Sequence, residues 1–331
     1  MNKQIILKSR PIGEVKVENF DILQVDVPKA DKGELLVKAK YISVDPYMRG
    51  RMSDGKTNIP AFELNKPIIG GTVSEILESK QPGYKKGDLV VGPMAWQEIQ
   101  SVQADKIALI DGLNVPPEYY LGILGMPGLT AYFGLLDIGK PQKGETVVIS
   151  GAAGAVGLVV GQIARIRGCR VVGIAGTDEK IKYLKEILLF DEVINYKWER
   201  NLQKAVELAC PNGTDIYFDN IGGPISDAVI TTINKGARII ICGQISQYNA
   251  IDQSVGPSPQ IILMKKSALM QGFSFTNYSS RYPEGFQALS TWLKDKKIIY
   301  KQTIIQGFEN LPQALIGLFH GTNTGKLIVE V

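Results

Sequence analysis

The stretch from Thr146 to Gly157 constrains the fold more than any other part of this chain. Four β-prone residues, Thr146–Ile149, run directly into a turn rich in glycine and alanine, and a helical pattern follows from about Ala155 to Arg167. Small residues let a backbone approach a pyrophosphate, and a helix N-terminus offers unpaired N–H groups and partial positive charge to phosphate oxygens. This strand–turn–helix order predicts a nucleotide cofactor, and with it an enzyme.

The turn departs from the standard dinucleotide fingerprint. Aligned to G-x-G-x-x-G, it reads Ala152-Ala153-Gly154-Ala155-Val156-Gly157, with alanine in the first glycine position. A match of this kind also occurs in ordinary strand–helix turns where the helix packs closely on the strand. The segments that follow the turn favour the cofactor interpretation.

The end of the next strand predicts which nicotinamide cofactor is used. Cys169–Ala175 is nearly all apolar, as expected of a buried parallel strand, and Gly176 follows it. Folds selective for NAD place Asp or Glu here, bonded to the ribose 2′-OH. Asp178 and Glu179 come later and are predicted to be acids of a helix's first turn, with Lys180 after them. A missing carboxylate and a nearby cation favour a 2′-phosphate, hence NADPH, although Lys180 could also be a solvated helix lysine.

Strands and helices continue to alternate after this point, which predicts an α/β fold with a doubly wound parallel sheet. Loops at the carboxyl ends of such strands form the ligand crevice, so we expect Asn220, Gly243 and residues near Tyr248 to lie there. The predicted helices are Asp178–Leu189, Asn201–Ala209 and Ile225–Asn234, and the predicted strands are Glu192–Tyr196, Asp215–Asp219 and Ala237–Cys242.

Length and composition narrow the class of protein. A chain of 331 residues favours two domains. The net charge is only +4 and no basic run stands out, so we expect no nucleic-acid partner. We do not expect a transmembrane helix in either uncharged stretch, because Tyr119–Leu136 contains several glycines and Thr146–Ala164 is the strand–turn–helix element. The N-terminal sequence is also not expected to be a signal peptide. We therefore expect a cytoplasmic protein without a membrane partner.

Metal chemistry is disfavoured by residue counts. The chain has three cysteines and one histidine, too few for a structural Cys₄ zinc site. Cys169 and Cys242 fall in predicted buried strands and are interpreted as small core residues. His320 is far from the cysteines in sequence and is predicted to be a structural or surface residue. We expect no bound metal.

The N-terminal third differs from the rest of the chain. Short apolar runs separated by turn residues predict a compact β domain, and the segment from about Tyr300 returns to this style. The cofactor domain is then inserted into the β domain. We expect a first part of the catalytic domain at residues 1–124, an NADPH-binding Rossmann domain at 125–299 and a return to the catalytic domain at 300–331. The apolar runs are Glu34–Tyr41, Ile68–Leu77, Asp88–Gly92 and Gln97–Val102.

Ordered motifs along nearly the whole chain carry a family resemblance. The chain resembles the zinc-independent medium-chain dehydrogenase/reductases, and within them the double-bond reductases that include leukotriene 12-hydroxydehydrogenase/15-oxoprostaglandin 13-reductase, curcumin reductase and plant alkenal reductases. The resemblance implies a GroES-like β domain, NADPH and a homodimer. The motifs are Tyr41–Met52, Gly125–Tyr132, Gly151–Gly157, Ala175–Lys180, Asn195–Lys197, Phe218–Gly223, Cys242–Asn249, Met270–Phe273 and Gly321–Lys326.

The resemblance also implies roles for particular residues. Lys180 and Tyr196 would hold the 2′-phosphate, and Asn220 would contact a ribose or the adjoining phosphate. Backbone N–H groups of Gly154, Ala155 and Val156 would face the pyrophosphate. The nicotinamide half would be bordered by Met126, Thr130, Cys242, Gly243 and Phe273–Phe275, and Asn323 would reach the cofactor from the C-terminal segment. For Tyr196 and Thr130, core packing with a satisfied hydroxyl is the alternative.

One departure from the family bears on catalysis. Many relatives carry a tyrosine a few residues before the Met270–Phe273 strand, where this chain reads Met264-Lys265-Lys266. Reduction of an activated C=C bond needs a hydride at the β-carbon and a donor facing the carbonyl oxygen, where enolate charge develops. A phenol, with a pKa of about 10, stays protonated and can donate. Tyr248 and Tyr47 are the candidates, the cofactor's ribose hydroxyl is a third, and a cleft-lining role is the alternative for both tyrosines.

Three functions follow from these observations. The first is NADPH-dependent reduction of the C=C bond in small-molecule enones and enals. The second is quinone reduction on the same scaffold. The third is a cofactor-binding protein without physiological turnover, against which the near-neutral charge and the intact cofactor segments count.

Overall fold

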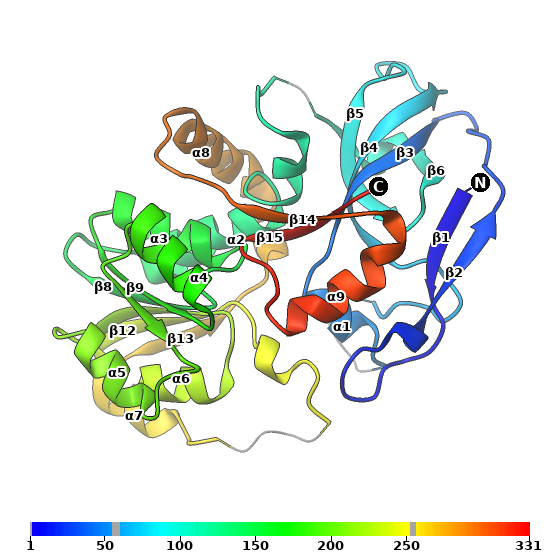
Figure 1. Ribbon diagram of the computed structural model, residues 1–331. Coiled ribbons are helices and arrows are strands. Elements are labelled where there is room, and N and C mark those ends of the chain that lie inside the picture. Colours follow the sequence, from blue (N-terminus) through cyan, green and yellow to red (C-terminus); the bar gives the residue numbers. More distant parts are fainter. Residues whose placement is uncertain (1, 55–59, 111, 252–255) are drawn as a thin grey trace. The chain divides into compact units, whose positions relative to one another are not determined.

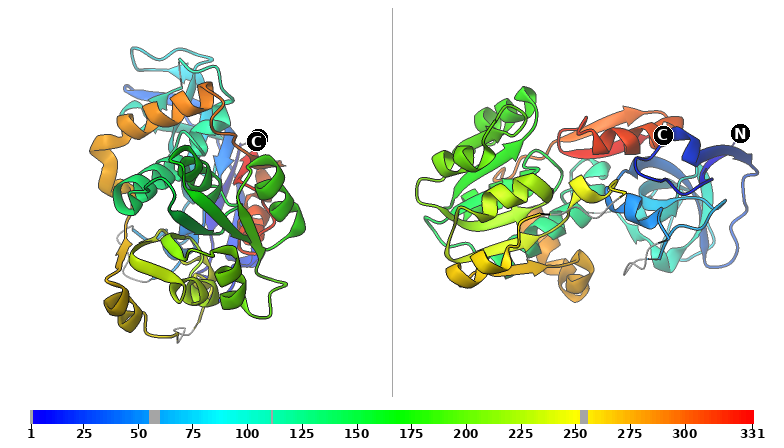
Figure 2. Two further views of the ribbon diagram at one scale, coloured as in Figure 1. Left: turned by 90° about the vertical axis from the view of Figure 1, so that its left-hand side faces the viewer. Right: turned by 90° about the horizontal axis from the view of Figure 1, so that it is seen from below.

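The computed structural model describes residues 2–54, 60–110, 112–251 and 256–331. It divides into two compact units. The first consists of Met1–Gly122, Gln302–Asn323 and Leu327–Val331, and the second of Ile123–Lys301 with Thr324–Lys326. The chain therefore leaves the first unit after its N-terminal third and returns to it near the C-terminus, as the red C-terminal segment shows in Figures 1 and 2.

The second unit is built on a six-stranded sheet in the order β10-β9-β8-β11-β12-β13, with all neighbours parallel. Its central strand β8 is buried at all five positions, as a parallel strand covered on both faces must be. This confirms the predicted doubly wound parallel sheet. The strands are β8 (Thr146–Ser150), β9 (Arg170–Ala175), β10 (Glu192–Asn195), β11 (Thr214–Asp219), β12 (Ile233–Ile241) and β13 (Leu269–Gly272).

Helices cover both faces of this sheet (Figures 1 and 2). One face carries α3 and α4, and the other carries α5, α6 and α7, whose apolar side chains join a core of buried valines and isoleucines from the strands. The helical segments are α2 (Met126–Phe133), η4 (Gly134–Gly139), α3 (Gly157–Ile166), α4 (Asp178–Lys182), η5 (Tyr183–Ile187), α5 (Leu202–Ala209), α6 (Gly223–Ile230), η6 (Ile245–Gln247), α7 (Gln260–Lys266), η7 (Phe275–Arg281) and α8 (Tyr282–Lys294).

Two of the predicted elements have wrong boundaries. The helix expected over Ile225–Asn234 ends at Ile230, and the strand expected at Ala237–Cys242 already begins at Ile233. The hydroxyl of Thr232 donates back to the carbonyl of Val229, which occupies a carbonyl at the helix end and helps to stop the helix. The buried Ile233 then belongs to the strand, and Cys242 lies just beyond its end.

The first unit is a β domain with antiparallel pairing. Its larger sheet has the order β14-β15-β3-β4-β5-β7, with β6 paired to β3, and a second sheet pairs β1 with β2. Helix α9 buries Leu311, Ala314 and Leu315 in the same core as Trp96. The elements are β1 (Asn2–Leu7), η1 (Val17–Asn19), β2 (Phe20–Val25), β3 (Glu34–Ser43), α1 (Tyr47–Arg51), β4 (Ile69–Ser79), β5 (Leu89–Ala95), β6 (Ile99–Gln103), η2 (Ala104–Lys106), β7 (Ala108–Leu109), η3 (Pro117–Leu121), β14 (Gln302–Gln306), η8 (Phe308–Asn310), α9 (Leu311–Phe319) and β15 (Lys326–Glu330).

Candidate active site

The turn between β8 and α3 closes tightly on itself. A Cβ atom on Gly157 would lie 2.4 Å from the carbonyl oxygen of Gly151, so only glycine fits where the helix begins. The N–H of Gly154 donates to that same carbonyl at 2.9 Å and is therefore already used within the turn. Among the described residues, no acceptor takes the N–H groups of Val156 and Gly157, which stand at the start of a ten-residue helix. N–H groups without an acceptor at a helix start can bind an anion.

Exposure divides the turn into two parts. Ala152 and Ala153 are buried, whereas Gly154, Ala155 and Val156 are partly exposed. The three residues expected at a pyrophosphate are therefore the ones that solvent reaches. A further glycine, Gly325, donates its N–H to the carbonyl of Ala153 at 2.8 Å and steadies the turn from the C-terminal segment.

The end of β9 carries the features expected around a 2′-phosphate. A Cβ atom on Gly176 would lie 2.6 Å from the ring of Tyr196, so the glycine lets this ring close over the strand end. Tyr196 remains 39% exposed, which disfavours the alternative of core packing. Thr177 caps α4 by accepting the N–H of Lys180 at 3.4 Å. Asp178 lies in the first turn of α4, as predicted from the sequence.

A second cation lies beside Lys180 that the sequence alone did not single out. Burial, and then repulsion from Lys197, lower the pKa of Lys180 below its usual value. Lys197 is exposed and forms no ion pair within the described ranges. The carboxylate of Asp178 accepts instead from the amide nitrogen of Asn195 at 3.1 Å. Two ammonium groups held close together fit a doubly charged ligand such as a phosphate monoester.

The ends of β8 and β11 are joined by a buried polar network. The hydroxyl of Ser150 donates to Oδ1 of Asp219 at 2.8 Å and accepts the backbone N–H of Asn220 at 2.9 Å. The side-chain Nδ2 of Asn220 donates to the Ser150 carbonyl at 2.7 Å. This arrangement fixes the Asn220 side chain and leaves its Oδ1 without a donor among the described residues. That oxygen can accept from a ribose hydroxyl.

The segment after β12 carries Cys242, Gly243 and Tyr248. Cys242 is partly exposed and lies outside the strand, so its interpretation as a buried strand residue was wrong. Burial, and then the charge of Asp219, raise the pKa of its thiol to about 12, which makes it unreactive as a nucleophile. The Tyr248 hydroxyl lies 3.1 Å from where a Cβ on Gly243 would be. Burial raises the pKa of Tyr248, so the hydroxyl keeps its proton.

Met126 and Thr130 share one face of α2. They are four residues apart, and every other residue of this helix is buried. Their partial exposure disfavours core packing for Thr130. The aromatic residues after β13 are also partly exposed: Phe273 packs edge-on against Phe218 at 6.5 Å between ring centroids, and Phe275 stacks on Tyr282 at 5.4 Å.

The remaining predicted site residues belong to the first unit. Tyr47 begins α1, and burial, followed by the charge of Asp45, raises its pKa above the ordinary tyrosine value. The hydroxyl of Ser43 donates to the carboxylate of Asp45. Asn323 is buried in the loop between α9 and β15. His320 follows α9 and is exposed.

Comparisons with known proteins identify the family. One matching family model is described as the N-terminal domain of oxidoreductase and covers residues 3–110, and another is described as zinc-binding dehydrogenase and covers residues 155–291. A Bacillus subtilis protein named as an NADP-dependent oxidoreductase is 54% identical over 331 residues, covering 99% of this chain and 97% of that protein. The chain belongs to the medium-chain dehydrogenase/reductases.

Within this family, its relatives include enzymes named as curcumin and 2-alkenal reductases. The NADPH-dependent curcumin reductase of Escherichia coli and the NADP⁺-dependent 2-alkenal reductase of Nicotiana tabacum are each 42% identical over 335 residues, covering all of this chain and 97% of each relative. The structure of CurA from Vibrio vulnificus in complex with NADPH matches with a TM-score of 0.95 and 42% identity, covering 99% of both chains.

The residues present fit the NADPH of this family. The paired cations Lys180 and Lys197, the two helix-start N–H groups and Oδ1 of Asn220 follow one edge of the sheet in the order that a phosphate, a pyrophosphate and a ribose require. No group of three His, Cys, Asp or Glu side chains within the described residues could hold a metal ion. None of the helices in the described part of the chain is long and apolar enough to cross a bilayer.

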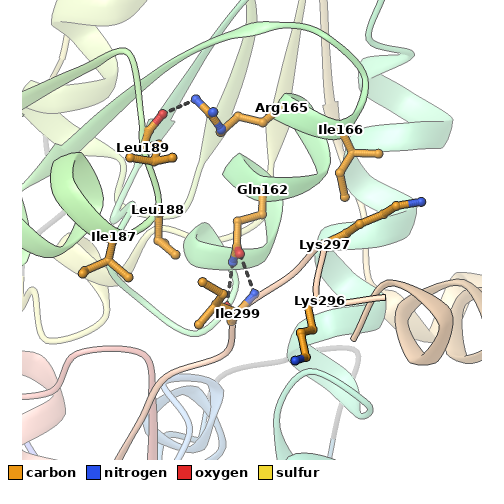
Figure 3. Close-up of a pocket in the computed structure, with 9 residues that line it drawn as sticks. All are labelled: Gln162, Arg165, Ile166, Ile187, Leu188, Leu189, Lys296, Lys297 and Ile299. Carbon is orange, nitrogen blue, oxygen red and sulfur yellow. Dashed lines mark hydrogen bonds between the residues drawn. The ribbon is translucent and has the colours of Figure 1, made fainter. Parts of the chain in front are cut away.

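A hollow of about 300 Å³ lies elsewhere on the second unit, at the far end of α3 from the glycine turn (Figure 3). Arg165, Lys296 and Lys297 border it together with aliphatic side chains. Leu189 and Lys296 both have φ 55°, the left-handed conformation that ends helices η5 and α8. Cations are ordinary neighbours of helix C-termini, and Arg165 donates to the Leu189 carbonyl. This hollow therefore lies where the ends of several helices meet, and it is not part of the reductase site.

Proposed function

We propose that this protein reduces the C=C bond of α,β-unsaturated aldehydes and ketones with NADPH. The observation that carries the proposal is similarity along the full chain to the curcumin and 2-alkenal reductases. The groups at the carboxyl ends of the parallel strands, which fit a phosphate, a pyrophosphate and a ribose, support it. Residues 125–299 would bind NADPH, and residues 1–124 with 300–331 would form the catalytic domain.

The 2′-phosphate would be selected at the end of β9. Lys180 and Lys197 supply two positive charges, Tyr196 supplies a hydroxyl, and Gly176 leaves room for the tyrosine ring. NADH lacks the phosphate and would leave the two ammonium groups to repel each other without compensation. Preference for NADPH over NADH follows.

The rest of the cofactor would follow the carboxyl edge of the sheet. N–H groups at the start of α3 face the pyrophosphate, and Gly154 and Ala155 allow close backbone approach. Asn220 accepts from a ribose hydroxyl. Residues proposed to border the nicotinamide half are Met126, Thr130, Cys242, Gly243, Phe273 and Phe275, with Asn323 contributing from the C-terminal segment.

Catalysis needs a proton donor at the substrate oxygen. NADPH, when bound, supplies a hydride to the β-carbon of the substrate. Tyr248 and Tyr47 are the proposed donors, because both have a raised pKa and therefore present an O–H group, not a phenolate, to a developing enolate. Lys265, which stands at the region where many relatives carry a tyrosine, is exposed on α7 and is not assigned this role.

We also propose a cytoplasmic homodimer. Strand β13 forms an edge of the six-stranded sheet, and Leu269 in it is 46% exposed. Ile261 and Met264 on the preceding helix are 56% and 73% exposed, so apolar surface continues beside this edge. The three cysteines are free thiols, as is usual in a reducing compartment.

An NADPH-oxidation screen tests the proposed function. Alkenals, alkenones and quinones would be compared at equal concentrations, with NADH as the cofactor control. Turnover of alkenals and alkenones well above that of quinones supports double-bond reduction. Turnover of quinones alone would favour quinone reduction, and binding of NADPH without turnover of any compound would favour a protein that only binds the cofactor.

A further inference from the structure

Asp219, the last residue of β11, is a buried carboxylate that the proposed reaction does not yet use. It is fully buried. Four donors converge on Oδ1: the hydroxyls of Ser150 and Tyr217 at 2.8 and 2.9 Å, and the backbone N–H groups of Ile221 and Gly222 at 3.0 and 2.9 Å. Oδ1 is therefore fully satisfied by hydrogen bonds from neutral groups.

The second carboxylate oxygen of Asp219, Oδ2, differs from Oδ1 in its hydrogen bonding. Oδ2 is buried and accepts no hydrogen bond from any group in the described ranges. No lysine, arginine or histidine in those ranges forms an ion pair with this carboxylate, which is held by neutral donors alone. Burying a carboxylate without a cation is strongly unfavourable, so its negative charge calls for a functional reason.

The position of Asp219 supplies that reason. Its backbone carbonyl accepts the N–H groups of Cys242 and Gly243 at 2.9 and 3.1 Å, so the end of β11 lies directly beside the segment proposed to border the nicotinamide. The field of the carboxylate reaches this segment, because it contributes to the raised pKa of the Cys242 thiol.

We propose that the buried charge of Asp219 favours the oxidised, positively charged nicotinamide and so promotes hydride donation. This inference rests on the proposed function. Transfer of a hydride, one proton with two electrons, to the β-carbon converts a neutral dihydronicotinamide ring into a cation and leaves negative charge on the substrate oxygen. A fixed anion near the ring stabilises the first of these products. Asp219 acts through its field and not by contact.

Asp219→Asn isolates the charge from the geometry. The amide keeps one oxygen for the four donors, and its NH₂ group takes the position of Oδ2, where no donor is displaced. Dissociation constants for NADPH, measured by its fluorescence, and for NADP⁺, measured by competition, give the readout without any turnover. We expect the ratio of the NADP⁺ constant to the NADPH constant to rise about tenfold, equivalent to about 1.4 kcal/mol.

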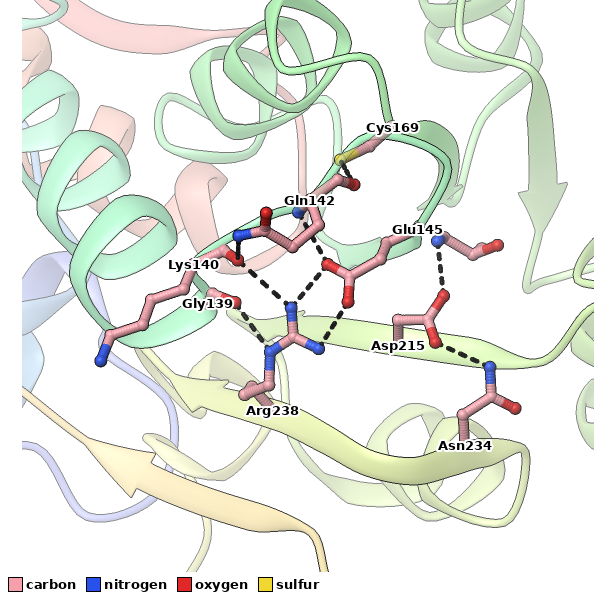
Figure 4. A network of polar contacts seen from close by, with 9 residues as sticks. Gly139, Lys140, Gln142, Glu145, Cys169, Asp215, Asn234 and Arg238 are labelled. Atoms are coloured by element: carbon pink, nitrogen blue, oxygen red, sulfur yellow. Dashed lines mark hydrogen bonds and ion pairs between the residues drawn. The ribbon is translucent and has the colours of Figure 1, made fainter.

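Two variants serve as controls. Asp215→Asn makes the same substitution on the same strand but at the opposite edge, where the Asp215 carboxylate accepts from the N–H of Thr146 and from Asn234, each at 2.8 Å (Figure 4). The two positions are four residue steps apart along the strand, about 13 Å. Ser150→Ala removes a donor and keeps the charge. We expect Asp215→Asn to leave the ratio unchanged and Ser150→Ala to weaken both cofactors equally.

The outcomes separate this inference from the proposed function. An unchanged ratio in Asp219→Asn, with both cofactors bound by the wild-type protein, would overturn the role of the charge and leave the reductase assignment intact. A wild-type protein that binds neither cofactor would overturn both. Asp219→Ser, a smaller neutral residue, repeats the test if the amide variant does not fold, and a ratio that rises in Ser150→Ala as well would assign the effect to geometry.

Discussion

The two edges of the parallel sheet use similar polar residues for different purposes. At the amino edge, Arg238 makes a two-point contact with Glu145 at 2.6 and 2.9 Å and also donates to the Gly139 carbonyl at 2.8 Å (Figure 4). Asp215, on the same edge, has both carboxylate oxygens occupied by donors. These groups form hydrogen bonds and ion pairs with one another, and these contacts hold the loops against the beginnings of the strands.

At the carboxyl edge, several hydrogen-bonding and charged groups have no partner within the described residues. The N–H groups of Val156 and Gly157, Oδ1 of Asn220 and the ammonium group of Lys197 have no partner within the described residues. The contrast teaches that residue type alone does not mark a site on this sheet. Asp215 and Asp219 stand on one strand, but both oxygens of Asp215 accept from donors, whereas Oδ2 of Asp219, at the carboxyl edge, accepts from none within the described residues.

The largest expected effect comes from Tyr248→Phe at the carboxyl edge. The substitution removes one hydroxyl, which accepts the backbone N–H of Gln244 at 3.4 Å, and keeps the ring, so packing should be little changed. Loss of a donor to a developing enolate lowers kcat by about 10²–10³-fold, or about tenfold where Tyr47 shares the role. Steady-state kinetics on an enone, with the Tyr47→Phe and double variants, provide the check. Full kcat with normal NADPH affinity would show that Tyr248 only lines the pocket and does not donate to the enolate.

Lys180→Ala tests the phosphate-selecting end of the same edge. Loss of a charged contact should weaken NADPH binding by roughly 10–150-fold and leave NADH binding almost unchanged. Lys182→Ala is the matched control, because this lysine lies on the same helix, is 72% exposed and pairs with Glu186. Equal losses for NADPH and NADH in Lys180→Ala would show that the lysine does not recognise the phosphate.

Arg238→Ala tests the amino edge and should have the smallest effect on function. The arginine and Glu145 side chains are only 19% and 22% exposed, so removing the guanidinium leaves acceptors partly buried without a donor. We expect the free energy of unfolding to fall by about 1–3 kcal/mol, with NADPH affinity unchanged. Denaturant titration and cofactor binding measure the two quantities. A variant that loses cofactor affinity but not stability would break the distinction between the edges.

Much of the second unit was predictable from the sequence because its signals are local. An apolar strand, a glycine-rich turn and a helical pattern follow one another at Thr146–Arg167, and the sheet confirms them. The boundary between α6 and β12 was predicted wrongly, because Ile233 follows a helical segment in the sequence and only its burial in the sheet shows that it belongs to the strand. Lys197 and Asp219 were missed for a related reason, since their importance arises from neighbours that the fold alone brings close.

Hydride transfer to the β-carbon is the central claim, and isotope transfer tests it most directly. The protein would be incubated with trans-2-hexenal and NADPH carrying deuterium at both C4 positions, and the product analysed by mass spectrometry and NMR. We predict hexanal with a single deuterium on C3, the former β-carbon. Deuterium on C1 of an alcohol would mean carbonyl reduction, and would contradict the proposed reaction.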